Sequence, residues 1–131
     1  MFLSNLNEEQ QLAFLSIAMK IVGADGHLDP KERRMIEAMR FEMGLLNEAK
    51  LPQGSIEELA KPFDNRKAQT SVMLESIALA YSDNDFSGEE QKILRALALI
   101  WGISEDDATE MENWVLDYNK LAKKAEEILA K

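Results

Sequence analysis

The chain has 131 residues, of which 46% are hydrophobic and 30% charged, and its formal net charge is −9. This length suits one hydrophobic core, so we expect residues 1–131 to form a single domain. The negative charge argues against nucleic acid as a partner, because nonspecific binding neutralises phosphates with clustered lysines and arginines. The absence of cysteine excludes disulfides, thiolate metal sites and thiol redox chemistry.

The composition also predicts the fold class. Alanine, leucine, glutamate, lysine and methionine dominate, whereas β-branched residues are few and scattered, which predicts an all-α fold of about six to seven helices. No apolar run approaches the ~20 residues that a membrane-spanning helix needs, so we expect no direct membrane insertion. The N-terminal segment lacks the basic and apolar regions of a secretory signal, and we therefore expect a cytoplasmic protein.

Capping signals place the first two helices. Asn7 followed by Gln10 has the spacing of a capping box and predicts a helix that begins near Asn7 and runs to about Val22. Residues 29–32 read Asp-Pro-Lys-Glu, with types favoured at N-cap, N1 and N3, and predict the start of a second helix. Gly44 is a natural residue to end that helix.

Similar signals place the helices in the middle of the chain. Ser55 opens a capping box and predicts a short helix. We expect Asp64 to cap the next helix, which runs to about Tyr81. Residues 87–90 read Ser-Gly-Glu-Glu and predict another helix start, and Gly102 is expected to end that helix.

From Ser104 to the end, the pattern predicts one long amphipathic helix or two abutting ones. Apolar residues alternate spacings of four and three and share one face, namely Met111, Val115, Tyr118, Ala122, Ala125 and Leu129, joined by Trp114, Leu121 and Ile128. We expect this stripe to pack on the protein's own core. A dimer through this C-terminal helix is the alternative, because a coiled coil has the same pattern.

The chain contains an internal repeat, in which residues 16–45 align with residues 74–103 without a gap. Four identities fall at equivalent places: Asp25 with Asp83, Glu32 with Glu90, Ala38 with Ala96, and Gly44 with Gly102. Each unit has a helix, a loop opening with Asp, an N-cap followed by Glu, and a helix ended by Gly. We expect two pseudo-symmetric helix–acidic loop–helix units that bury their apolar faces against each other.

The second loop carries the clearest chemical signal. Residues 83–88 match the first six positions of an EF-hand loop, with oxygen ligands at one, three and five and glycine at six. The bidentate Glu at position twelve is missing. Glu90, in the first turn of the next helix, can instead join Asp83 and Asp85 around a cation. This set predicts weak binding of Ca²⁺ or Mg²⁺, while capping and turn roles for the same residues remain the alternative.

The first loop is the weaker candidate. Asp25 and Glu32 are its acidic positions, but His27 and Pro30 occupy the third and sixth loop positions, where an oxygen ligand and glycine belong. The chain has one histidine, no cysteine and no Gly-x-Ser-x-Gly elbow. Nucleophilic catalysis therefore has no support, and we expect no enzyme activity.

The paired segments 24–32 and 82–90 resemble the TerB tellurite-resistance family, over roughly residues 8–118. That family is all-α with approximate internal symmetry, and its acidic residues have been proposed to bind metal. The matching positions are Asp25, Glu32, Asp83 and Glu90. The chain departs from the pattern at Asn84, where the first loop has Gly26.

Domains similar to TerB occur in bacterial stress-response systems and at the front of a membrane-anchored DnaJ-like co-chaperone. The resemblance therefore implies a non-enzymatic stress-response module that works with a protein partner of unknown identity. Binding of a divalent cation at the acidic loops is one expected function. The alternative is a protein-interaction domain without metal, whose acidic surface docks a basic partner.

Overall fold

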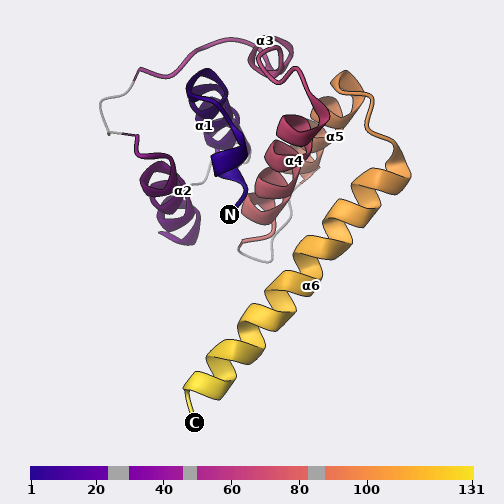
Figure 1. Cartoon of the computed structure of the whole chain (residues 1–131). Coiled ribbons are helices and arrows are strands. Elements are labelled where there is room, and N and C mark those ends of the chain that lie inside the picture. Colours follow the sequence, from indigo (N-terminus) through magenta and orange to yellow (C-terminus); the bar gives the residue numbers. More distant parts are fainter. Residues whose placement is uncertain (24–29, 46–49, 83–87) are drawn as a thin grey trace.

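The computed structural model describes residues 1–23, 30–45, 50–82 and 88–131 (Figure 1). These residues form helices and no strand, which confirms the predicted all-α fold. The helices are η1 (Leu3–Asn5, a 3₁₀ turn), α1 (Glu8–Val22), α2 (Pro30–Met43), α3 (Ile56–Ala60), α4 (Arg66–Ala80), α5 (Gly88–Ile100) and α6 (Glu105–Leu129). Among these described helices, none is both long and apolar enough to cross a membrane.

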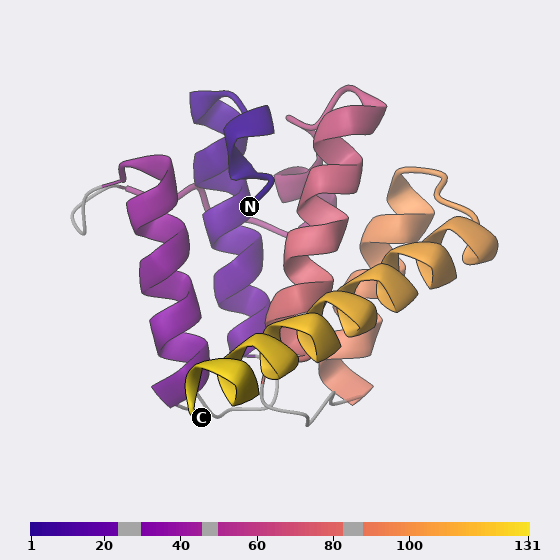
Figure 2. The same cartoon turned by 60° about the horizontal axis from the view of Figure 1, so that its bottom comes forward.

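Two helix pairs form the body of the protein. Helix α1 packs against α2, α4 packs against α5, and α1 and α4 pack together at the centre. In Figure 2 the four helices stand side by side in the order α2, α1, α4, α5, and the short α3 packs on α1 and α5. The central faces of α1 and α4 are fully buried, as at Phe14, Ile17 and Val72. The expectation that the two repeat units face each other is thus confirmed.

The helix ends mostly follow the capping signals. Asn7 and Gln10 form the expected capping box, with backbone-to-side-chain distances of 2.8 and 2.9 Å, and Ser55 caps α3 in the same way. The prediction that Asp64 caps α4 is wrong. Asn65 is the cap, and its Oδ1 accepts from the backbone N–H of Ala68 at 2.8 Å. Asp64 lies one residue before the N-cap position. Its carboxylate accepts instead from the side-chain amide of Asn65.

Helix α6 is one continuous helix, and only its first half packs on the body. Met111 and Val115 are buried where α6 packs against α4. Every residue from 117 to 131 is exposed. The expectation that the whole apolar stripe lies on the protein's own core is therefore wrong for the second half. The 25-residue α6 is longer than the 15-residue α4 beneath it, and it runs on past the bundle (Figure 1).

The N-terminal residues tie three helices together. The amino group of Met1 lies 2.7 Å from Glu42 on α2 and 3.0 Å from Glu75 on α4. The backbone N–H of Phe2 also donates to Glu75, at 2.8 Å. The ring of Phe2 contacts Trp114 of α6 edge-on, with centroids 5.5 Å apart. The buried carboxylate of Glu75 therefore has both a charged partner and a hydrogen-bond donor.

Candidate functional site

Two buried glutamates mark one end of the bundle. Glu32 is the third residue of α2 and Glu90 is the third residue of α5, the equivalent position of the repeat. They are 3% and 2% exposed, whereas their neighbours Lys31 and Glu89 are exposed. Helices α1 and α4 end, and α2 and α5 begin, at the same end of the bundle (Figure 2). The repeat thus places two carboxylates at this end, each in the first turn of an outer helix.

The remaining predicted site residues cannot be placed beside these glutamates. Asp25, Asp83 and Asp85 lie outside the described residues, as do the expected caps Asp29 and Ser87. Among the residues that the structure does describe, no three or more acidic, histidine or cysteine side chains are grouped to hold a metal ion. The ligand sets predicted for the two loops therefore remain predictions.

The chemistry of this end is that of carboxylate oxygens near helix N-termini. A first-turn carboxylate is favoured by the partial positive charge of the helix start. Burying that carboxylate is nevertheless unfavourable unless it is hydrogen-bonded or paired with a cation. Oxygen ligands suit hard cations such as Ca²⁺ and Mg²⁺ better than zinc.

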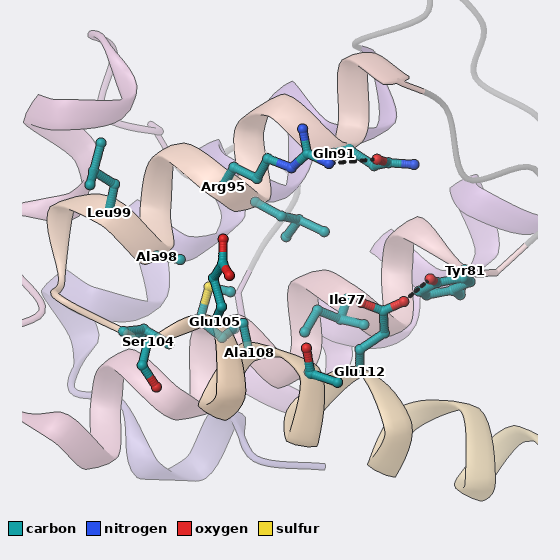
Figure 3. A pocket seen from close by; sticks show the side chains of 14 residues that line it. Ile77, Tyr81, Gln91, Arg95, Ala98, Leu99, Ser104, Glu105, Ala108 and Glu112 are labelled. Atoms are coloured by element: carbon teal, nitrogen blue, oxygen red, sulfur yellow. Dashed lines mark hydrogen bonds between the residues drawn. The ribbon is translucent and has the colours of Figure 1, made fainter.

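A second candidate site is a groove between α4, α5 and the first half of α6, with a volume of about 680 Å³ (Figure 3). Its floor is apolar, with Met73 and Ile77 from α4 and Leu94 and Ala98 from α5. Polar side chains surround this floor, including Gln91, Arg95, Ser104, Glu105 and Glu112. Leu99 also lines the groove and is 83% exposed.

A short hydrogen bond joins two walls of this groove. The hydroxyl of Tyr81, at the C-terminal end of α4, donates to Oε1 of Glu112 on α6 at 2.5 Å. Burial raises the pKa of Tyr81 to about 12, and the hydrogen bond and the negative charge of Glu112 add to the effect. On the opposite wall Arg95 donates to Gln91 within α5, at 3.4 Å (Figure 3). The groove combines an apolar floor with polar edges, an arrangement that suits an amphipathic ligand.

Sequence reasoning did not find this groove. Its walls come from three helices, and Tyr81 and Glu112 are 31 residues apart. The one hint of the groove in the sequence is Leu99. Helix α5 packs on the core through Leu94 and Leu97, so Leu99 lies off that buried face. A single exposed leucine does not mark a binding surface by itself, so this signal was not enough to predict the groove.

No protein-family profile, curated protein or solved structure matches this chain. The resemblance to the TerB family, based on the two loop segments, accordingly stays a prediction. The buried glutamates and the groove are the features of the structure that bear on function.

Proposed function

We propose that this chain is a non-enzymatic, cytoplasmic, TerB-like module that binds a hard divalent cation weakly at its acidic loops. Glu32 and Glu90 would be the inner carboxylates of the two loop sites, with Asp25 in the first and Asp83 and Asp85 in the second. The observation that supports the proposal is the burial of both glutamates at equivalent positions of the repeat. A role in a stress response is what the TerB resemblance adds.

The third position of a helix is not buried in every case in this chain. Glu58 occupies the N3 position of the capping box of α3 and remains exposed. Gln10 occupies the same position in α1 and is 4% exposed, but it is neutral and donates to the carbonyl of Pro62 at 3.0 Å. Glu32 and Glu90 are acidic residues that are buried at the third position of their helices. Carboxylate oxygens at these two equivalent positions are ligands of the type that hard divalent cations prefer.

The second loop has no basic residue in its own sequence. The first lysine or arginine after Asp83 in the sequence is Lys92. Its ammonium group pairs with the exposed Glu89 at 3.3 Å, on the solvent side of α5. Residues 83–90 carry four carboxylates, three of which are the predicted ligands, and this local density of negative charge favours a cation. The missing twelfth-position Glu indicates weak binding, with a dissociation constant of roughly 0.1–1 mM for Ca²⁺.

Calorimetric titration with Ca²⁺ and then Mg²⁺ tests this proposal, combined with NMR shifts to locate the site. We expect saturable heat, and shifts centred on residues 83–90. Glu90→Gln keeps the side-chain shape and should weaken binding by about tenfold or more, since it removes one of the inner carboxylates. Glu89→Gln is the matched control, because it makes the same charge change on an exposed neighbour and should leave binding nearly unchanged.

A second function is favoured by the groove. Its apolar floor and the acidic groups Glu105 and Glu112 suit a basic amphipathic helix from a partner protein. The titration distinguishes the two functions. No heat and no NMR shift at millimolar Ca²⁺ would contradict the cation site and leave the interaction domain as the better interpretation.

A further inference from the structure

The second half of α6 presents an apolar face to solvent. Residues 117–131 are all exposed, and Leu121, Ile128 and Leu129 are 65%, 67% and 83% exposed. These side chains continue the stripe that begins with the buried Met111 and Val115. Figure 1 shows this half of the helix extending beyond the other helices.

The spacing of the stripe points to another helix as its partner. Trp114, Tyr118, Leu121, Ala125 and Ile128 follow one another in alternating steps of four and three. These steps average 3.5 residues, which is the repeat of helices that pair in a coiled coil. A helix of about 15 residues is marginal in water without tertiary contacts. A second helix along the stripe supplies the contacts that the body of this chain does not.

The distribution of charge selects a second copy of the chain as the partner. Residues 117–131 contain four lysines and three acids, whereas the other 116 residues contain 11 basic and 21 acidic residues. Two copies of this nearly neutral segment can approach each other without strong repulsion, while two bodies repel. A strongly basic partner would be drawn to the acidic body instead.

The position of the acidic body at one end of the stripe selects an antiparallel arrangement, and the order of side chains is compatible with it. Large residues lie toward the ends of the exposed stripe and Ala122 and Ala125 in its middle. Antiparallel pairing sets Tyr118 against Leu129, Leu121 against Ile128, and alanine against alanine. It also places the two acidic bodies at opposite ends of the helix pair, whereas a parallel pair would place them side by side.

We infer that residues 117–131 of α6 pair antiparallel with the same segment of a second copy, forming a weak homodimer. Four large side chains and two alanines per helix bury less than the ~800 Å² per partner of a standard stable interface. The dimer is therefore concentration-dependent. This inference does not depend on cation binding, because the paired segment lies at the far end of α6 from the groove and carries none of the predicted ligands.

Analytical ultracentrifugation over about 10 µM to 1 mM tests the dimer, a range that covers weak association. We expect the mass to rise from the 14.8 kDa of the monomer toward twice that value. The double variant Leu121→Lys with Ile128→Lys should stay monomeric with an unchanged melting temperature, because both residues are exposed. Leu99→Lys changes a leucine on α5 that is even more exposed, so it is the control and should dimerise normally.

Disulfide trapping tests the orientation, since the chain has no cysteine of its own. A mixture of Tyr118→Cys and Leu129→Cys should form the mixed disulfide on mild oxidation, and each variant alone should crosslink poorly. Efficient crosslinking of each variant with itself would overturn the antiparallel arrangement. A wild-type chain that is monomeric throughout, or a dimer that the double lysine variant leaves intact, would overturn the inference itself.

Discussion

Tyr81 illustrates how a single side chain can couple two helices and respond to pH. It is the C-cap residue of α4, and its hydroxyl donates to Glu112 of α6. Ionisation would replace this hydrogen bond by two adjacent negative charges in a partly buried position. The native state therefore favours the neutral phenol, and the pKa of Tyr81 is raised to about 12 from 10.0.

We predict that Tyr81 loses its proton at a higher pH in the native state than in the unfolded state, and that the free energy of unfolding falls over that pH range. Because the native pKa is the higher one, the native state keeps its proton when the unfolded state has lost it. The contribution to stability is complete below pH 10 and is lost as the pH rises through about 12. Ultraviolet titration of the native protein should show a late phenolate step that Tyr81→Phe removes and Tyr118→Phe, the control, retains. Identical titration curves for wild type and Tyr81→Phe would contradict this.

At the residue scale, the sequence predicted local partners better than distant ones. The Asn7–Gln10 box follows from types and spacing alone, because both residues lie in one helical turn. The burial of Glu32 and Glu90 did not follow, since a first-turn glutamate satisfies the same capping pattern whether exposed or buried. Glu75 was missed as well, because its partners are the N-terminal amino group and Phe2, more than 70 residues away.

Helix ends are the best-determined feature at the scale of elements. Gly44 and Gly102 have φ values of 68° and 65°, so each terminates its helix in the left-handed region. The backbone N–H of Leu45 then bonds the carbonyl of Arg40 at 3.0 Å, and that of Ile103 bonds Ala98 at 2.8 Å. The two repeat units are therefore ended by the same device, as their aligned glycines predicted.

Substitution of these glycines gives a prediction with an internal control. Gly44→Ala and Gly102→Ala should each lower the free energy of unfolding by about 1 kcal/mol, because a Cβ disfavours positive φ. Gly88, the first residue of α5, has open space around its Cα and no positive φ. Gly88→Ala should therefore be neutral or slightly stabilising. Urea unfolding in the presence of EDTA measures all three, and equal effects at Gly88 and Gly102 would contradict the φ argument.

The length of α6 marks the limit of sequence prediction at this scale. Its stripe predicted a buried face along the whole helix, and this holds only through Val115. Periodicity records which side of a helix is apolar but not which molecule covers it. The same limit applies to the groove. The sequence predicts that α5 and α6 are amphipathic, but the space between them depends on how both helices pack on α4.

At the scale of the whole molecule, contacts of the N-terminus and of α6 hold the two repeat units in place. The Met1 amino group joins α2 to α4, and Phe2 packs on Trp114 of α6. Arg66 of α4 pairs with Asp107 of α6 at 3.0 Å, although both side chains are about half exposed and the pair adds little stability. The buried Glu75 is the centre of this arrangement, since it receives both the ammonium group and a backbone N–H.

We predict that the Met1–Glu75 contact makes folding stability fall above pH 8. Burial lowers the pKa of the Met1 amino group, but the hydrogen bonds and charges of Glu42 and Glu75 outweigh it and raise the pKa above 8.0. A raised native pKa means that the charged amine stabilises the fold fully below pH 8 and that this contribution is lost as the pH rises through the native value.

Glu75→Gln should lower the free energy of unfolding at pH 7 by about 1 kcal/mol, because a charge-assisted hydrogen bond becomes a neutral one. The same variant should lose less stability than wild type between about pH 7 and pH 9.5, below the range in which Tyr81 titrates. Glu37→Gln, an exposed residue 3.8 Å from Arg40, is the matched control and should follow the wild-type pH profile. Urea unfolding at the two pH values measures both effects. If wild type and Glu75→Gln lose the same free energy of unfolding between the two pH values, the Met1 amino group is not the source of the pH dependence.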